Sequence, residues 1–203
     1  MTPTDWPKPL FVVDVEGNGA NPPDLVEVAV VPVEDGQPLP DKARTWLIRP
    51  PVPIPGRISR IHGITNDMVA GCPDWADVAG EVAEVLDGAW IVAHSAGVEY
   101  SVLSRHLPDW KPAGVLDTLR LAKAVFPGRK GFGLDALIDH TGISLANVVG
   151  TRHRAAYDAQ ATALLLLHLA ARYDTWQALA AHAVPPGMPG LPSTPEPEEQ
   201  TLW

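Results

Sequence analysis

Residues 9–19 read Pro-Leu-Phe-Val-Val-Asp-Val-Glu-Gly-Asn-Gly, an apolar run that meets two acidic residues and then turns. The run Leu10–Val13 is short and rich in Val and Phe, which predicts a buried β-strand that ends at the turn. Side chains two residues apart on a strand share a face, so Asp14 and Glu16 would project together. Two buried carboxylates repel each other, and a divalent cation such as Mg²⁺ or Mn²⁺ is the usual compensation. The alternative is a strand that surfaces in a polar loop.

The composition indicates one folded domain followed by a tail. The chain has 203 residues, of which 46% are hydrophobic and 19% charged, enough for one buried core. We place the folded domain at residues 1–184 and a Pro-rich, acidic, flexible tail at 185–203. The formal net charge of −9 disfavours a protein that coats nucleic acid, but not an enzyme that meets phosphate through metal ions.

Three features predict a soluble, cytoplasmic protein with no membrane partner. Cys72 is the only cysteine, so no internal disulfide can form, which fits a reducing compartment. The N-terminal residues lack the basic and apolar regions of a signal peptide. The longest apolar run, residues 163–171, is interrupted by His168 and is too short to span a bilayer.

The order of predicted elements is a strand meander followed by alternating helices and strands. Strands are predicted at residues 10–13, 25–33 and 43–48, the second broken only by Glu27 and Pro32, and short connections favour an antiparallel meander. Two later strands, 89–93 and 115–116, alternate with predicted helices at 66–69, 74–86, 98–107, 117–125, 134–139, 155–172 and 174–182. This order predicts a mixed five-stranded α/β sheet with helices on both faces.

Three further segments place polar residues near predicted strand or helix ends. Glu99 follows the fourth strand, His153 and Asp158 flank the start of the longest helix, and His62 lies in the turn 62–65. Each has an ordinary interpretation, as a first-turn acid, a loop histidine or a turn residue. Together with the first pair, however, they supply four carboxylates and a histidine. Four carboxylates can hold two Mg²⁺ ions, and a histidine can take a proton from an attacking water, which is the chemistry of phosphodiester hydrolysis.

These segments resemble, in order, the motifs of the DEDD superfamily of 3′→5′ exonucleases in its histidine subtype, which has the ribonuclease H-like fold. Asp14-Val15-Glu16 and the turn at 17–19 match the first motif, and 94–99 matches the second in length and partly in residue. The third motif is matched by His153, Ala155 and Asp158, continued by Ala159 and Thr162. Segments 62–65, 117–122 and 134–137 also resemble family segments, so the resemblance runs from Leu10 to about Ala171.

The resemblance implies a role for each matched residue. Asp14, Glu16 and Asp158 would hold one metal ion, and Asp14 would also contact a second. Glu99 would act on the second ion weakly or through a water, and His153 would be the general base. The residues expected near the terminal nucleotide are the backbone of Gly17, Asn18 and Gly19, the side chain of His62, and Ser95 in place of the family's Asn.

Two departures from the family pattern bear on activity. The family usually has Asp where Glu99 stands, and the extra methylene adds roughly 1.5 Å of reach, so the side chain must fold back or a metal must shift. Slow activity or an altered metal preference would follow. The family often has two Thr after the Glu of its first motif, where this chain has Gly17 and Asn18. Its contacts with the terminal nucleotide, or its choice of substrate, would therefore differ.

The leading functional hypothesis is a metal-dependent exonuclease acting on nucleic-acid 3′ ends, with single-stranded DNA favoured and two divalent ions, Mg²⁺ or Mn²⁺, as cofactors. One alternative is a ribonuclease H-like binding or scaffold module with weak or lost catalysis, and another is an RNA 3′-trimming exoribonuclease. The eight Lys and Arg side chains from Arg105 to Arg154 either guide the strand or form ordinary solvated surface. At the end of the tail, Gln200–Trp203 is similar to the short peptides with which bacterial replication and repair proteins bind the sliding clamp.

Overall fold

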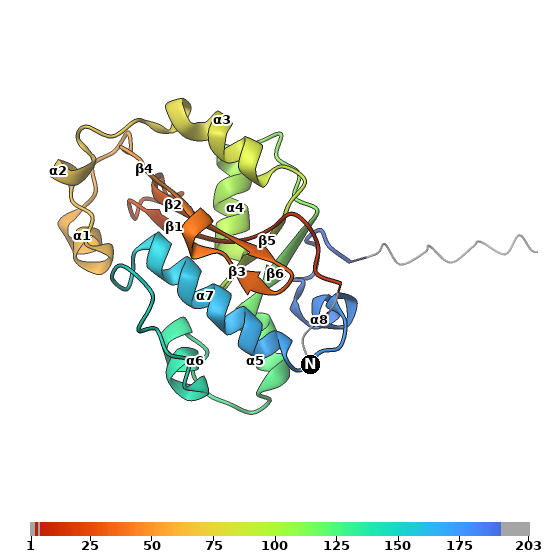
Figure 1. Cartoon of the computed structure of the whole chain (residues 1–203). Helices are drawn as coiled ribbons and strands as arrows, with labels where there is room; N and C mark the ends of the chain where they lie inside the picture. Colours follow the sequence, from red (N-terminus) through yellow and green to blue (C-terminus); the bar gives the residue numbers. More distant parts are fainter. Residues whose placement is uncertain (1–2, 4, 192–203) are drawn as a thin grey trace, which may run out of the picture.

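The computed structural model describes residues 3 and 5–191, which form a central mixed sheet between helices (Figure 1). Its strands are β1 (Leu10–Gly17), β2 (Leu25–Glu34), β3 (Gln37–Pro38), β4 (Arg44–Leu47), β5 (Trp90–Ala93) and β6 (Gly114–Asp117). The order is β3-β2-β1-β5-β6, and β4 also pairs with β2. β1 is antiparallel to β2 and parallel to β5, which is parallel to β6. The sheet therefore has six strands rather than the predicted five, because β3 adds a two-residue strand beyond the turn after β2.

The helices are α1 (Gly56–His62), α2 (Asn66–Val69), α3 (Trp75–Leu86), α4 (Gly97–His106), α5 (Thr118–Val125), α6 (Leu134–Thr141), α7 (Ala155–Ala170) and α8 (Trp176–Ala183), with a 3₁₀ turn at Pro40–Lys42. The predicted caps form: the side chain of Thr65 accepts from Met68 N–H, and that of Asp117 accepts from Leu119 N–H. Helix α1 was not predicted, and it places His62 in a helix rather than a turn. Within the described part of the chain, no helix is both long enough and apolar enough to cross a membrane.

The sheet separates two hydrophobic cores. Helices α5, α6, α7 and α8 cover the face that carries Val12 and Ala29, whereas α3 and α4 cover the face that carries Val13 and Val28 (Figure 1). Because side chains alternate along a strand, Asp14 and Glu16 continue the face of Val12. The two carboxylates therefore point toward the side of the sheet on which α7 packs.

Residues 184–190, which include the start of the predicted flexible tail, lie against the sheet. Val184 is buried, and the N–H of Val115 on β6 donates to the carbonyl of Pro189 at 2.9 Å. Gly190 lies so close to Trp90 that a Cβ there would come within 2.7 Å of the indole. The packed part of the chain thus extends past the predicted boundary at residue 184 and covers the edge of β6, which would otherwise expose unpaired backbone groups. Gln200–Trp203 lies outside the described residues.

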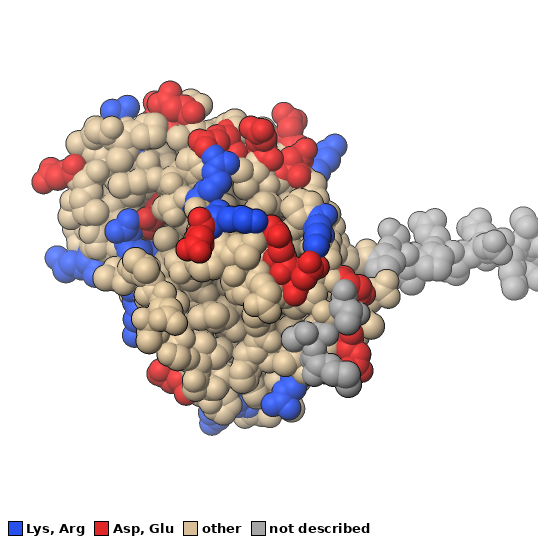
Figure 2. Space-filling view, viewed as in Figure 1, with Lys and Arg blue, Asp and Glu red and all other residues tan. Residues whose placement is uncertain are grey.

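Acidic side chains gather along α3, at the top of the molecule in Figure 2. The segment from residue 74 to residue 87 contains five acidic side chains and no Lys or Arg: Asp74, Asp77, Glu81, Glu84 and Asp87. Arg44 pairs with Glu81 and Arg49 pairs with Asp74, but the surface keeps a net negative charge, which repels a phosphate backbone. We therefore expect nucleic acid to approach from another side.

Candidate active site

Three of the four predicted carboxylates converge at the end of β1. Oxygen atoms of Asp14, Glu16 and Asp158 all lie within 4.8 Å of one another. Asp14 and Glu16 come from the last half of β1, and Asp158 comes from the first turn of α7. Because α7 packs directly over β1 and β2, the packing of this helix brings Asp158 to the strand end.

The environment of this cluster favours a bound cation. Burial raises the pKa of Asp14 well above its usual range, and the charges of Glu99, Glu16 and Asp158 raise it further. Burial, with the charges of Asp158 and Glu27, raises the pKa of Glu16 to about 8, although Arg154 opposes the rise. Carboxylates that are crowded and short of water in this way are stabilised by a divalent cation. The three residues therefore fit a divalent-metal site.

Glu99 lies beside Asp14 but outside the group of three. It sits in the first turn of α4 with 6% of its surface exposed, and its Oε2 is buried with no hydrogen-bond partner among the described residues. Burial raises its pKa to about 8, opposed by a hydrogen bond from its own backbone N–H. The longer side chain thus folds back on its helix. A buried, unpartnered carboxylate oxygen is costly, which adds a second indication of a cation here.

His153 precedes α7 and lies next to Asp158. Its backbone N–H donates to Oδ2 of Asp158 at 3.1 Å, while its side chain is exposed. Burial raises the pKa of Asp158, and both the charge of His153 and this hydrogen bond oppose the rise. The φ angle of His153 is 61°, a left-handed conformation that is uncommon for a residue with a side chain. The loop therefore holds His153 at the mouth of the carboxylate cluster.

A pocket of about 340 Å³ adjoins the cluster and contains several of the residues predicted to meet the nucleotide. Glu16, Gly17, Gly19 and His62 line it, together with apolar side chains of α1 and α4. His62 is 2% exposed, and its Nδ1 accepts from the N–H of Ile64, so Nε2 carries the proton. That Nε2 forms no hydrogen bond of ordinary geometry among the described residues, although the nearby backbone of Gly17 opposes the lowering of the His62 pKa by burial. Gly19 has a φ of 74°, and a Cβ there would lie 2.5 Å from Ile58 on α1, so glycine is needed for α1 to close the pocket.

The side chains of Asn18 and Ser95, which were also predicted to lie near the nucleotide, are outside this pocket. The side chain of Asn18 is buried, donates to Asp24 and to the Val52 carbonyl, and accepts from the N–H groups of Ala20 and Asp24. Its amide is thus committed to holding the turn after β1. Ser95 is exposed after β5, with its N–H donating to Oδ1 of Asp117 at 2.9 Å. Neither residue lines the pocket.

Ser95 carries backbone strain, and Ser95→Gly should stabilise the protein. Its φ of 75° costs a residue with a Cβ about 1–3 kcal/mol, whereas glycine adopts it freely. After the entropy that glycine loses on folding, we expect a net gain of about 1 kcal/mol, or roughly 2–4 °C in Tm. The control is Ser101→Gly, an exposed site within α4, which should lower Tm instead because glycine disfavours helices. Equal effects of the two changes would contradict strain at Ser95.

The raised carboxylate pKa values predict a pH-dependent stability of the metal-free protein. Glu16 and Glu99 titrate near pH 8 when folded, above their ordinary 4.5, so the folded state holds protons that the unfolded chain releases. Stability should therefore fall as pH rises from about 5 to about 8. In EDTA, Tm should be lower at about pH 8.5 than at about pH 6, and Mn²⁺ should raise it most at the higher pH. Glu99→Gln should reduce the slope, and a metal-free Tm that rises with pH would contradict the prediction.

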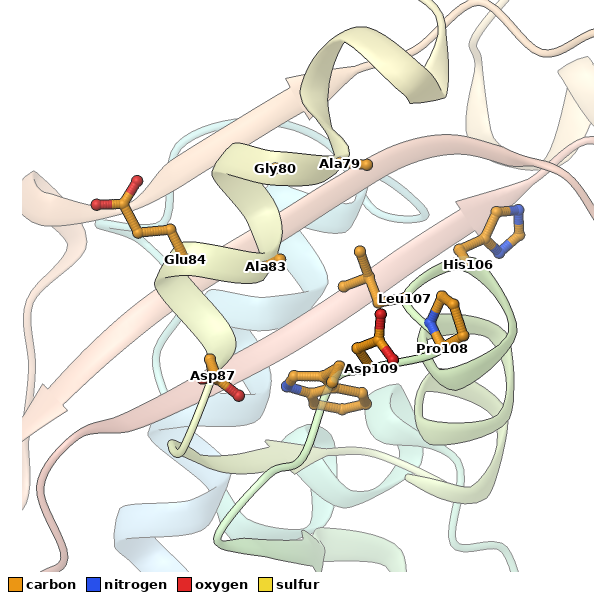
Figure 3. Close-up of a pocket in the computed structure, with 10 residues that line it drawn as sticks. Ala79, Gly80, Ala83, Glu84, Asp87, His106, Leu107, Pro108 and Asp109 are labelled. Carbon is orange, nitrogen blue, oxygen red and sulfur yellow. The ribbon is translucent and has the colours of Figure 1, made fainter.

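A second pocket, larger than the one beside the carboxylate cluster, lies elsewhere on the molecule. It has a volume of about 490 Å³ and lies between α3 and the end of α4 with the segment that follows it (Figure 3). Its floor includes Ala79, Ala83, Leu107 and Trp110, and none of its lining residues belongs to the carboxylate cluster. Size alone therefore does not locate the chemistry here.

Sequence analysis missed a buried ion pair beside the cluster. Glu27 on β2 is 1% exposed and accepts from Arg154, which was interpreted as a strand-guiding or surface residue. The available signal was the acidic residue itself, which interrupts an otherwise apolar strand. Its partner lies 127 residues away, and only the tertiary fold brings the two together.

Comparisons with known proteins agree with this geometry. The family model described as Exonuclease matches residues 11–166. The DNA polymerase III subunit epsilon-like protein of Rhodobacter capsulatus is 35% identical over an alignment of 175 residues that covers 83% of this chain and 24% of that protein. The 3′-5′ exonuclease DinG of Bacillus subtilis is 33% identical over an alignment of 170 residues that covers 79% of this chain and 17% of that protein. The chain thus spans less than a quarter of the length of these relatives.

Solved structures add similarity of fold. The structure of Exonuclease X in complex with 5′ overhanging duplex DNA matches with a TM-score of 0.68 and 32% identity, covering 80% of this chain and 92% of that one. A structure of Exonuclease I matches with the same TM-score of 0.68 at 15% identity, covering 84% and 42%, which supports the ribonuclease H-like fold alone. The chain therefore belongs to the exonuclease family matched over residues 11–166, within the DEDD superfamily of 3′→5′ exonucleases.

Proposed function

We propose that this chain is a metal-dependent 3′→5′ exonuclease that removes nucleotides from DNA 3′ ends. The observation that carries the proposal is the convergence of Asp14, Glu16 and Asp158 within 4.8 Å, at the rim of a pocket that contains His62. The solved structure of Exonuclease X, which is 32% identical to this chain, is a complex with 5′ overhanging duplex DNA. That similarity favours DNA over RNA as the substrate.

In the proposed mechanism Asp14, Glu16 and Asp158 would hold divalent ions, Mg²⁺ or Mn²⁺, with Glu99 as a further ligand. Such ions neutralise the phosphate and stabilise charge on the attacking and leaving oxygens. Asp14, Glu16 and Asp158 set where the scissile phosphate lies, and the pocket beside Glu16 accepts the terminal nucleoside. The apolar walls from α1 and α4 suit a nucleobase, and His62 can donate from Nε2 to it or to its sugar.

His153 accepts a proton from the attacking water. The oxygen of that water forms a bond to phosphorus as the bond from phosphorus to the O3′ of the preceding nucleotide breaks, and O3′ takes a proton from solvent. The products are a nucleoside 5′-monophosphate and a strand shortened by one. The exposed side chain of His153 can return its proton to water, so each cycle restores the neutral base.

Two other functions are kept as alternatives by specific features. The folded-back conformation of Glu99 favours a binding or scaffold module with weak catalysis. An exoribonuclease is the other alternative because, where the family often has two Thr, this chain has Gly17, which has no side chain, and Asn18, whose side chain is bonded within the turn. The predicted sliding-clamp contact of Gln200–Trp203 stays a prediction from sequence.

The deciding experiment is digestion of end-labelled single-stranded DNA, duplex DNA with a recessed 3′ end, and single-stranded RNA, each with Mg²⁺ and with Mn²⁺. A 3′ label should appear at once as mononucleotide, while a 5′ label should give a ladder of shortening strands. If RNA is digested faster than DNA, the substrate is RNA rather than DNA, but the protein is still a 3′→5′ exonuclease. Metal binding without digestion of any substrate would contradict the proposal and favour the scaffold module.

A further inference from the structure

Glu27 is a buried carboxylate near the start of β2, between apolar neighbours. It is 1% exposed, and the residues around it on β2 are buried hydrophobic side chains. In the β1–β2 register Glu27 lies directly opposite Glu16, so both carboxylates point toward α7. A carboxylate in such a place is tolerated only when its charge and its oxygens are fully compensated.

The first turn of α7 supplies that compensation. Nε of Arg154 donates to Oε2 of Glu27 at 3.0 Å, and Nη2 donates to Oε1 at 2.6 Å. The backbone N–H of Ala155, the first residue of the helix, donates to Oε2 at 2.8 Å. Parallel hydrogen bonds between a guanidinium and a carboxylate fix both distance and orientation. Glu27 therefore fixes the start of α7 to β2 at the level of Glu16.

The same turn of chain carries two residues of the site. Arg154 directly follows His153, and Asp158 lies one helical turn further on, where it accepts from the N–H of His153 at 3.1 Å. The other ion pair in this loop, Arg152 with Asp135, is about half-exposed at both ends and constrains the loop weakly. The placement of α7 on β2 thus determines how Asp158 and His153 stand relative to Asp14 and Glu16.

We infer that Glu27 and Arg154 are positioning residues for the metal and base groups, a role that rests on the proposed function. Neither residue belongs to the group of three carboxylates, and Arg154 is held by Glu27 rather than presented to a phosphate. Groups that orient metal ligands from behind typically change metal affinity or activity by about 10–100-fold when removed. The pair acts by keeping Asp158 within reach of Asp14 and by aiming His153.

The test compares Arg154→Lys with the double change Glu27→Met and Arg154→Met. Lysine keeps the charge but cannot form the two parallel hydrogen bonds. We expect Arg154→Lys to lower kcat about 10–100-fold and Mn²⁺ affinity about 10-fold, with KM for DNA within about threefold of wild type. The double variant replaces a buried ion pair by apolar side chains, which is often neutral for stability. It should melt near the wild-type temperature and still show low kcat and weak Mn²⁺ binding by calorimetry.

Leu86→Ala is the control for a merely structural effect. Leu86 is fully buried on α3, in the core on the opposite face of the sheet, so this change destabilises without touching α7. Measured well below its melting temperature, it should keep kcat and Mn²⁺ affinity. The expected effect of Arg154→Lys is about 10–100-fold. The inference is overturned if the folded Arg154→Lys variant keeps kcat and Mn²⁺ affinity within about twofold of wild type. It is also overturned if Leu86→Ala lowers kcat and Mn²⁺ affinity as much as Arg154→Lys does. Should the double variant not fold, Arg154→Lys decides.

Failure of the proposed function would look different. If the wild-type protein binds Mn²⁺ but digests no nucleic acid, the exonuclease proposal fails. The Mn²⁺ affinities of wild type and Arg154→Lys would still show whether the pair positions Asp158. If instead the wild type digests DNA and Arg154→Lys does so equally well, the exonuclease stands and the positioning role falls.

Discussion

Asp14→Asn is expected to lower the rate of nucleotide release at least about 100-fold, because displacing reacting groups by on the order of 1 Å already costs that much. Asparagine has the shape of aspartate but not its charge, and an NH₂ group replaces one carboxylate oxygen, so the side chain would bind divalent ions far less well. The same change should raise the Tm of the metal-free protein near pH 8. Burial and the neighbouring charges of Glu99 and Glu16 already oppose ionisation of Asp14, and a neutral amide removes that repulsion.

Asp35→Asn is the control for loss of a surface charge. Asp35 lies in the turn after β2, is exposed, and pairs with Lys8, which precedes β1. Exposed ion pairs contribute little to stability. This variant should keep its rate, its Mn²⁺ affinity and its Tm. Digestion of end-labelled DNA by Asp14→Asn at the wild-type rate would contradict the proposed role of Asp14, and an unchanged Mn²⁺ isotherm would place the cation elsewhere.

The sequence was sufficient to predict the features that depend on local periodicity. The Val-rich run before Asp14 and the alternation of side chains placed two carboxylates on one face, and the six ordered motifs indicated the ribonuclease H-like fold. Side-chain caps such as Thr65 and Asp117 also follow from short-range hydrogen bonding. Helix α1 was missed because it begins at Gly56 directly after a Pro-rich loop, and its N-cap residue, Pro55, makes no side-chain cap hydrogen bond.

The features that the sequence could not determine depend on distant packing. Glu27 is explained by Arg154 and the N–H of Ala155 at the start of α7, and Asn18 is explained by Asp24 and the Val52 carbonyl. The extra methylene of Glu99 was visible, but its folded-back conformation depends on the space beside Asp14. The chain after α8 was interpreted as a tail because of its Pro and Gly content, whereas the edge of β6 gives it a surface to cover.

His153→Ala is expected to lower kcat by roughly 10²–10⁴-fold, the usual contribution of a general base. The imidazole is exposed and its neighbour Asp158 is held through the backbone N–H of residue 153, so removing the side chain leaves that hydrogen bond in place. Mn²⁺ affinity should therefore stay near the wild-type value. The measurement is single-turnover release of a labelled 3′ nucleotide at saturating Mn²⁺. His182→Ala, at an exposed histidine on α8, should release the label at the wild-type rate.

Two further variants separate loss of the base from distortion of the loop. The left-handed conformation of residue 153 suits asparagine, so His153→Asn should keep the loop geometry and still be slow. Because the position is open to solvent, added imidazole should partly restore the rate of His153→Ala and leave Asp14→Asn inactive. The proposed role as a base would be contradicted if imidazole did not restore the rate of His153→Ala and His153→Asn were fully active. Residue 153 would then act only by holding the loop. A mechanism with metal ions and a base requires that His153→Ala loses rate but keeps Mn²⁺ affinity. It also requires that Asp14→Asn loses both the rate and the Mn²⁺ affinity.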